Sequence, residues 1–266
     1  MTDPLQHRLD AALRLAGEAS AMAMAMRPAP GSGRGTLKGW QDWVTEADQT
    51  IERFLSASLA AAFPDDGFQG EEGGVSRGGS LRWVIDPIDG TSNYARGANR
   101  FCISIACLEG NTPLIGVIAA PTVGETVSAR RGQGAFLNGA AIRAAETSDP
   151  RQAIMEVGWS RRRSAAEYLA VCERVLGGGS SLRHGGSGAL GLVDVAIGRL
   201  DGYAELHINL WDVAAALAIL REAGAAVSDF LAADGAPDGN GIFACAPGLA
   251  EVWSDLPGLP RALTAD

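Results

Sequence analysis

The chain has 266 residues, of which 47% are hydrophobic and 20% are charged, so it can bury a sizeable core in one large domain or in two halves. Its formal charge is −9 and its longest basic run is Arg161-Arg162-Arg163, so we expect no nucleic-acid partner. No apolar stretch reaches the length of a membrane span, and the N-terminus lacks a signal-peptide core. We therefore expect a cytoplasmic protein with no membrane partner.

Cysteine and histidine are scarce and scattered in the sequence. The four cysteines show no metal or disulfide spacing, which predicts buried thiols in a reducing compartment. The three histidines do not cluster, so a zinc site is not expected. An acidic chain repels phosphorylated ligands unless a bound cation reverses the sign of the charge locally.

The N-terminal part of the chain predicts two helices separated by a loop. Leucines at helical spacing indicate a helix over residues 4–27, which Pro28 ends. Residues 28–39 are rich in glycine and proline and are predicted as a loop. A second helix follows "QDWVTEAD", with Ile51 and Leu55 on its buried face, and it ends before an acidic loop, "PDDGFQGEEGG".

The middle of the chain predicts a largely antiparallel sheet. Strand-like runs alternate with turn signals, and Asn138-Gly139 is typical of a hairpin. We expect this sheet to pack on the two N-terminal helices. The expected strands cover residues 82–86, 101–108, 114–119 and 125–129.

After about residue 150 the predicted strands and helices alternate, which is typical of an α/β unit. We therefore predict two layered halves, an α+β half over residues 1–147 and an α/β half over residues 148–266 with a second, smaller sheet. The expected strands are 153–158, 200–205, 226–230 and 242–245, and the expected helices are 164–176, 187–198 and 211–224.

Two aspartates three residues apart follow an apolar strand-like run in "WVIDPIDGT". Pro87 fixes its own φ, so Asp86 and Asp89 can turn to the same side, with the Ile88 carbonyl between them. Three hard oxygen ligands within four residues suit Mg²⁺, and no sulfur or imidazole competes for another metal. This stretch predicts a magnesium site.

Acidic loops on an acidic protein are usually only solvated, and Asp-Gly is often only a turn. That explanation is weaker here because the aspartates follow an apolar run, and because Asp212 stands between "INLW" and "VAAALAIL". Carboxylates in half-buried places need partners, and a metal is a common one. Further acids stand in "GEE" (Glu71 and Glu72) and in "TEAD" (Asp48), near the ends of predicted elements. Their spacing does not fit an EF-hand calcium loop.

The segment Gly90-Thr91-Ser92-Asn93 follows the predicted metal turn. Glycine lets the backbone approach a ligand closely, and threonine or serine begins a helix well. A helix start beside divalent cations is a place for a phosphate group. Thr91 is either only a helix cap or a hydroxyl that orients a water molecule.

Five ordered motifs between about residues 38 and 230 resemble those of the inositol monophosphatase family. They are "VTEAD", "GEE", "WVIDPIDGTSNY", "GSGALGLVDVAIGRLDGYAE" and "LWDVAAALAILREAGAAVSD". The resemblance implies a Mg²⁺-dependent, lithium-sensitive phosphomonoesterase that binds two or three ions. It also implies a homodimer with a layered αβαβα sugar-phosphatase fold, in which the N-terminal sheet is largely antiparallel and the C-terminal sheet is smaller.

The resemblance also implies roles for individual residues. The implied metal ligands are Glu71, Asp86, the Ile88 carbonyl, Asp89 and Asp212. The implied catalytic residues are Asp48 and Thr91, which would hold the attacking water, and Glu72, which would support metal-bound waters. The implied substrate contacts are Asp89, Gly90, Thr91, Gly186, Ser187, Gly188, Glu205 and Asp212. Two segments depart from the family pattern, which leaves open the role of Lys38 and of the short loop over residues 73–80.

The implied substrate is a small polyol or sugar monophosphate, inositol monophosphate included. Histidinol phosphate is the main alternative, because its amine would suit Glu205 in an acidic chain; fructose 1,6-bisphosphate and nucleotide 3′-phosphates are others. A NAD-binding module is a rival, because "GSGALG" fits G-x-G-x-x-G, but the stretch before it is short and polar. A non-catalytic relative that binds a metal and a polyol or a partner protein is a further rival, although all expected ligands and Thr91 are present.

Overall fold

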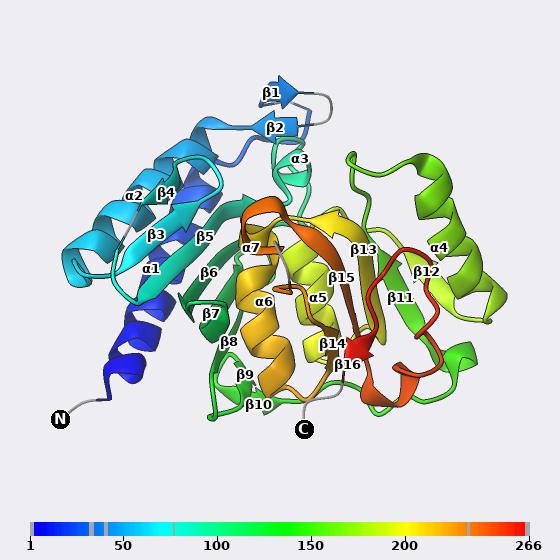
Figure 1. The fold of residues 1–266 in the computed structure, drawn as a ribbon. Coiled ribbons are helices and arrows are strands. Elements are labelled where there is room, and N and C mark those ends of the chain that lie inside the picture. Colours follow the sequence, from blue (N-terminus) through cyan, green and yellow to red (C-terminus); the bar gives the residue numbers. More distant parts are fainter. Residues whose placement is uncertain (1–2, 32–34, 40–41, 77, 233–234, 264–266) are drawn as a thin grey trace.

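The computed structural model describes residues 3–31, 35–39, 42–76, 78–232 and 235–263 (Figure 1). Its elements stack in five layers: two helices, a large sheet, two central helices, a smaller sheet and an outer helix. This is the αβαβα arrangement that the family resemblance implies. Buried apolar side chains fill every interface between layers. One set lies between the two N-terminal helices and the large sheet, a second surrounds the central helices between the two sheets, and a third lies between the smaller sheet and the outer helix.

Helices α1 (Pro4–Met26) and α2 (Glu46–Ala62) cover one face of the first sheet, close to their predicted bounds. Helix α1 has its proline in the first turn, where the missing N–H costs nothing. Helix α2 begins with a reciprocal capping box between Thr45 and Asp48. The apolar faces of both helices pack on the sheet around the fully buried ring of Trp83.

An eight-stranded sheet forms the first β-layer, in the order β10-β9-β8-β7-β6-β5-β3-β4. Neighbouring strands are antiparallel except β3 and β5, which confirms the predicted meander. Asn138 (φ 48°) and Gly139 (φ 83°) form the tight turn between β9 and β10. The strands are β3 (Gly67–Gly70), β4 (Gly74–Ser76), β5 (Leu81–Asp89), β6 (Cys102–Glu109), β7 (Thr112–Ala120), β8 (Glu125–Arg130), β9 (Ala135–Leu137) and β10 (Ala140–Ile142).

Two stretches that we predicted as loops contain short strands. Strands β3 and β4 form a hairpin within the acidic segment, so part of residues 73–80 belongs to the sheet edge. Strands β1 (Thr36–Gly39) and β2 (Asp42–Val44) pair as a separate two-stranded sheet, partly within residues 28–39. Residues 32–34 and the side chain of Lys38 lie outside the described part of the chain. The sequence missed these strands because they have too few residues to show an apolar alternation.

Helices α5 (Gly188–Ala196) and α6 (Leu210–Glu222) form the central layer between the two sheets. Helix α6 is buried on all sides over most of its length, as expected for a helix that is apolar all round. Gly116 on β7 lets this helix approach the sheet closely, since an added methyl group would overlap the carbonyl oxygen of Ala215. The buried residues around α5 and α6 come from both sheets, so the two halves share one core.

The second sheet has six strands in the order β12-β11-β13-β15-β14-β16. Strand β11 is parallel to β12 and β13, and the other pairs are antiparallel, so the sheet is mixed and not the parallel sheet typical of an α/β unit. Helix α4 (Ala165–Gly177) covers its outer face together with Trp253. The short edge strands β12 and β16 were not predicted. The strands are β11 (Ile154–Val157), β12 (Ser181–Arg183), β13 (Gly202–Ile208), β14 (Ala226–Ser228), β15 (Asn240–Cys245) and β16 (Ala262–Leu263).

The remaining elements are single turns: α3 (Thr91–Tyr94), α7 (Gly235–Asp238) and two 3₁₀ turns, Pro150–Gln152 and Pro247–Leu249. The first of the 3₁₀ turns lies in the connection between the two sheets. The predicted division into residues 1–147 and 148–266 falls in the same connection. The two halves share one core, so the division into two units stays a prediction.

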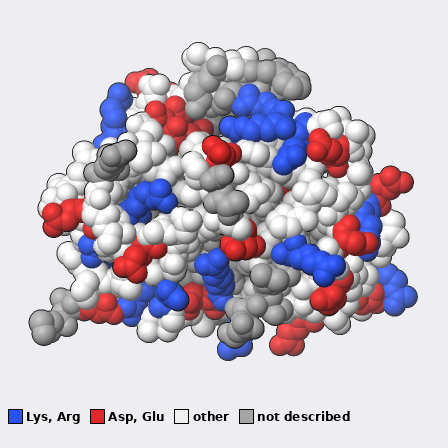
Figure 2. All heavy atoms as spheres, viewed as in Figure 1, with Lys and Arg blue, Asp and Glu red and all other residues white. Residues whose placement is uncertain are grey.

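The burial of the cysteines, the apolar character of the helices and the distribution of surface charge can be compared with the expectations from composition. All four cysteines, Cys102, Cys107, Cys172 and Cys245, are buried, as predicted. No described helix combines the length and the apolar character that a membrane span needs. Figure 2 shows positive and negative side chains interspersed over one face, with a group of basic side chains at its upper centre.

The close approach of α6 to β7 predicts a large effect of a small change. Gly116→Ala should lower the free energy of unfolding by about 2 kcal/mol, because the new methyl group meets backbone that cannot rotate away. Gly17→Ala is the matched control: Gly17 is exposed on α1 with nothing near an added methyl group, and alanine should stabilise the helix by about 0.5–1 kcal/mol. Urea unfolding measures both, and equal stability of the two variants would contradict this packing.

Candidate active site

Strand β5 carries two acidic residues at the centre of the first sheet. Its register against β6 shifts between Asp86, which lies opposite Ser104, and Asp89, which lies opposite Cys102. The turn that we predicted here is therefore a bulge within one continuous strand. A bulge changes the direction in which side chains point, and both carboxylates end up almost fully buried, with exposed fractions of 1% and 6%.

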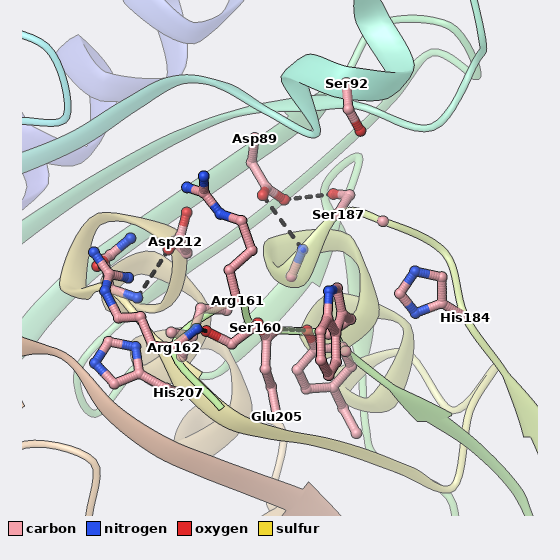
Figure 3. Close-up of a pocket in the computed structure, with 17 residues that line it drawn as sticks. Asp89, Ser92, Ser160, Arg161, Arg162, His184, Ser187, Glu205, His207 and Asp212 are labelled. Atoms are coloured by element: carbon pink, nitrogen blue, oxygen red, sulfur yellow. Dashed lines mark hydrogen bonds between the residues drawn. The ribbon is translucent and has the colours of Figure 1, made fainter. Parts of the chain in front are cut away.

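Asp212, in the first turn of α6, joins these two carboxylates. The backbone N–H of Asn209 donates to Asp212 Oδ2 at 2.9 Å, which fixes the side chain. One oxygen from each of Asp86, Asp89 and Asp212 lies within 4.8 Å of the other two. We call these three residues the acidic cluster; Figure 3 shows Asp89 and Asp212 at one end of a pocket.

The acidic cluster is electrostatically strained without a cation. Burial raises the pKa of Asp86 well above its ordinary value, and the charges of Glu71 and Asp89 add to the effect. Burial also raises the pKa of Asp89. Burial, followed by the charge of Asp89, raises the pKa of Asp212 to about 8. Crowded carboxylates that offer only hard oxygen donors fit a divalent cation, which would hold them in the ionised form.

Asp89 also binds the N-terminus of α5. Its Oδ2 accepts hydrogen bonds from the Ser187 hydroxyl and from the Ala189 N–H at 2.9 Å, and its Oδ1 accepts from the Gly188 N–H at 3.3 Å. Gly186, Ser187 and Gly188, predicted as substrate contacts, therefore line the pocket with part of their donors directed at Asp89. A dinucleotide pyrophosphate would need the same helix terminus. The G-x-G-x-x-G match is consequently not a NAD site.

The short helix α3 begins directly after the acidic cluster. Gly90 is its N-cap residue, with φ 92°, a left-handed conformation that favours glycine, so Thr91 is not the cap. The Thr91 hydroxyl lies 3.1 Å from Asp48 Oδ1 and 2.9 Å from the Ile88 carbonyl oxygen. It can donate its proton to one of these oxygens and accept a hydrogen bond from a water molecule. This geometry favours a hydroxyl that orients water.

A glutamate that the sequence analysis missed anchors the loop with "GEE". Glu52 on α2 is 4% exposed, and its Oε2 accepts the backbone N–H of Glu72 at 2.9 Å. Gly70 and Gly73 pass so close that a methyl group added to either would overlap the Glu52 carboxylate. Glu52 follows Asp48 by four residues, so both lie on one face of α2. That spacing is the signal that could have identified it.

The two glutamates of "GEE" influence the site through their charge. Glu71 is the second cause, after burial, of the raised pKa of Asp86. Burial is the main cause of the raised pKa of Asp48, and the charge of Glu72 adds to it. Among the described residues, neither glutamate belongs to the group whose oxygens lie within 4.8 Å of one another. Their roles as metal ligand and water support stay predictions.

A pocket of about 610 Å³ opens beside the acidic cluster. Glu205 on β13 lines it, and the Tyr203 hydroxyl donates to Glu205 Oε2 at 2.6 Å. Burial raises the pKa of Glu205 to about 7, so its charge changes near neutral pH. Gly158 leaves room for this pair, because an added methyl group would overlap both side chains. Glu205 therefore lies where a substrate contact was predicted, and Tyr203 orients it.

The wall of the pocket formed by the loop between β11 and α4 was not predicted. Trp159, Arg161 and Arg162 line it, together with His184 and His207 (Figure 3). In the sequence, the run Arg161-Arg162-Arg163 indicated only that the chain is too weakly basic for a nucleic-acid partner. Its position after a predicted strand and before a predicted helix was the available signal, because loops at strand ends often carry binding residues.

Comparisons with curated proteins identify relatives of this chain. The model of the inositol monophosphatase family matches residues 5–251. An inositol-1-monophosphatase of Rhizobium meliloti is 39% identical over 194 residues, which cover 71% of this chain and 73% of that protein. A Xylella fastidiosa protein named Nus factor SuhB is 42% identical over 199 residues, which cover 74% of this chain and 72% of that protein.

Two solved structures are similar to this chain in both fold and sequence. The extragenic suppressor protein suhB of Bartonella henselae has a TM-score of 0.85 at 30% identity, over 91% of this chain and 95% of that one. The Thermotoga maritima IMPase has a TM-score of 0.82 at 31% identity, over 92% and 94%. With a family match over nearly the whole length, the same fold and a cluster of acids at a pocket, this chain belongs to the inositol monophosphatase family and is a phosphomonoesterase.

Proposed function

We propose that the protein hydrolyses a small phosphate monoester, such as inositol monophosphate or a related polyol or sugar phosphate, with Mg²⁺ as its cofactor. The observation that carries the proposal is the convergence of Asp86, Asp89 and Asp212 at one end of a polar pocket. Oxygen-only donors favour Mg²⁺ over zinc or copper. An enzyme with net charge −9 needs such a cation before it can accept an anionic ester.

The proposed metal ligands are those that the family resemblance implies: Glu71, Asp86, the Ile88 carbonyl, Asp89 and Asp212. Two or three ions bound there would polarise the phosphoryl group and favour attack by water. Four ligating carboxylates and a dianionic phosphate balance the charge of three divalent ions, whereas two ions would leave the site anionic. The bulge in β5 and the capped start of α6 hold the ligands of the acidic cluster in place before any ion arrives.

Thr91 and Asp48 are the proposed catalytic pair. When the Thr91 hydroxyl donates to Asp48 Oδ1, its oxygen keeps lone pairs that can accept a hydrogen bond from the attacking water. Thr45 supports Asp48, since its backbone N–H donates to Asp48 Oδ2 at 2.8 Å. Glu72, whose backbone N–H is bound by Glu52 on α2, is the proposed support for further metal-bound waters. The chain supplies positioning and proton acceptance, and no covalent intermediate is needed.

The proposed substrate contacts are Asp89, Gly90, Thr91, Gly186, Ser187, Gly188, Glu205 and Asp212. The backbone N–H groups that begin α3 suit the phosphate, and Glu205 suits a hydroxyl of the polyol. A substrate with a cationic amine, such as histidinol phosphate, is less favoured than a polyol phosphate, because Glu205 is only partly ionised near pH 7 and arginines line the same pocket. A homodimer is part of the proposal and rests on the family resemblance alone, and the cytoplasmic location stays an expectation from the sequence.

Asp89→Asn tests the metal-dependent activity. Asparagine keeps an acceptor for the N-terminus of α5 but removes a charge from the acidic cluster. Phosphate release should be measured with Mg²⁺ on inositol 1-phosphate, histidinol phosphate, fructose 1,6-bisphosphate and adenosine bisphosphate. We expect turnover of at least one by the native protein and a loss of about a hundredfold or more in the variant. Asp10→Asn, on the exposed face of α1, is the control. Absence of Mg²⁺-dependent turnover on every substrate would overturn the proposal.

Thr91→Ala should lower kcat about a hundredfold while KM changes less than about threefold, because the water-orienting contact is made chiefly in the transition state. Thr91→Ser restores the hydroxyl and should recover most of the rate. Steady-state kinetics on the best substrate measure both variants. A rise in KM with kcat preserved would show instead that Thr91 only binds phosphate.

The polyol end of the pocket should depend on pH through Glu205. Its pKa of about 7 means that the carboxylate is ionised above this pH and accepts hydroxyl hydrogen bonds best there. We therefore expect KM for a polyol phosphate to rise as the pH falls through about 7, and Glu205→Gln to remove this step. The control substrate is p-nitrophenyl phosphate, which has no polyol hydroxyl and should show no such step with either protein. An unchanged pH profile in the variant would remove Glu205 from the pocket chemistry.

A further inference from the structure

The pocket beside the acidic cluster has an aromatic side chain exposed in its wall. Trp159 lines the pocket and is 36% exposed, whereas Trp83 and Trp253 are each 1% exposed. Among the tryptophans that the structure describes, Trp159 is the only exposed one. A large apolar side chain that meets water at a binding pocket marks a surface that a ligand can cover. The proposed hydrolysis has so far given this side chain no role.

The backbone places Trp159 next to Glu205. Trp159 follows strand β11, and the N–H of the preceding residue, Gly158, donates to the carbonyl oxygen of Ala204 at 2.8 Å. Gly158 is so close to Glu205 that a methyl group added to it would overlap the Glu205 carboxylate. Trp159 is thus joined directly to the residue that touches Glu205. A ligand whose hydroxyl group is bound by Glu205 would lie within reach of the indole.

Neighbouring rings hold the indole in place. The ring of Tyr168 on α4 meets the ring of Trp159 at 82°, and their centroids are 5.3 Å apart. Tyr168 also contacts His184, which lines the same pocket and whose Nδ1–H donates to the carbonyl oxygen of Val157 at 3.0 Å. In Figure 3, His184 and Asp212 lie on opposite sides of the pocket. This aromatic wall is therefore preformed, on the side of the pocket away from Asp212.

We propose that Trp159 is a specificity-determining residue, whose indole packs against the ring of a cyclic alcohol while Glu205 accepts a hydrogen bond from one of its hydroxyl groups. The inference rests on the proposed function and deepens it, because it names the shape of the alcohol. The C–H groups on one face of a saturated ring carry a small positive charge and suit the negative face of an indole. A ring presents these groups together, whereas an open chain must first lose conformational freedom. Phosphate esters of cyclic alcohols are therefore bound better than those of open-chain alcohols.

The test compares inositol 1-phosphate with glycerol 2-phosphate. Both are esters of secondary alcohols with hydroxyl groups on the two neighbouring carbons, so they differ chiefly in the ring. At saturating Mg²⁺, Trp159→Ala should lower the ratio of kcat/KM for inositol 1-phosphate to that for glycerol 2-phosphate about three- to tenfold, mainly through KM for the inositol ester. Trp159→Phe keeps an aromatic face and should recover most of the ratio. Leu169→Ala, which shortens an exposed apolar side chain of α4 outside the pocket, is the control and should leave the ratio unchanged.

The outcomes separate this inference from the proposed function. An unchanged ratio in Trp159→Ala, or an equal fall in Leu169→Ala, would overturn the role of Trp159, while Mg²⁺-dependent turnover would leave the phosphatase proposal intact. If the native protein hydrolyses neither ester, calorimetric binding of the same two compounds in Mg²⁺ decides. A loss of affinity confined to inositol 1-phosphate in Trp159→Ala supports the role. Equal affinities of the native protein for both compounds, or no binding of either, overturn it.

Discussion

Repulsion among three closely spaced carboxylates, two of them buried, is the constraint on which this structure depends. Asp86 and Asp89 are almost fully buried within a strand, and Asp212 reaches them from a helix of the central layer. Burial raises the pKa of each, which means that the fold alone does not compensate their charge. Close carboxylates in a buried place cost free energy unless a positive charge is bound beside them, and a hard divalent cation would supply that charge. The packing therefore creates a group of carboxylates that could hold a metal ion.

The same carboxylates also join the layers of the fold. Asp89 lies at the end of β5 and accepts hydrogen bonds from the N-terminus of α5, so the first sheet is tied to the central helices at the site itself. Asp212 closes the capping box of α6 with Asn209. Asp48 does the same for α2 with Thr45. The side chains proposed for the site are thus also the ones that hold three helix starts in place, and this makes their positions rigid.

Side chains of both signs line the pocket. The acidic cluster suits cations, which under the proposed function would in turn bind a phosphate. Burial raises the pKa of Glu205, which lines the same pocket, to about 7, so this carboxylate is only partly ionised near neutral pH. The arginines of the loop before α4 add positive charge to the same pocket, and Arg162 bonds Asn209, which in turn binds Asp212. The loop carries none of the residues of the acidic cluster, so its sequence can vary without disturbing them, and loops of this kind often set specificity.

The sequence by itself determined the family, the long helices, the antiparallel meander and the acids at its ends, because these depend on local periodicity and on ordered motifs. It also placed Asp86, Asp89 and Asp212 in one site. Only the tertiary structure decided that the "DPID" segment is a bulge, that Ser187 and Gly188 donate hydrogen bonds to Asp89, that Glu52 holds the loop with "GEE", and that Tyr203 orients Glu205. The bulge and the contacts of Asp89 depend on partners 13 to 100 residues away in the sequence. The contact between Tyr203 and Glu205 depends on the direction in which each side chain points. Such contacts leave no periodic pattern in the chain, since they arise only when distant layers pack together.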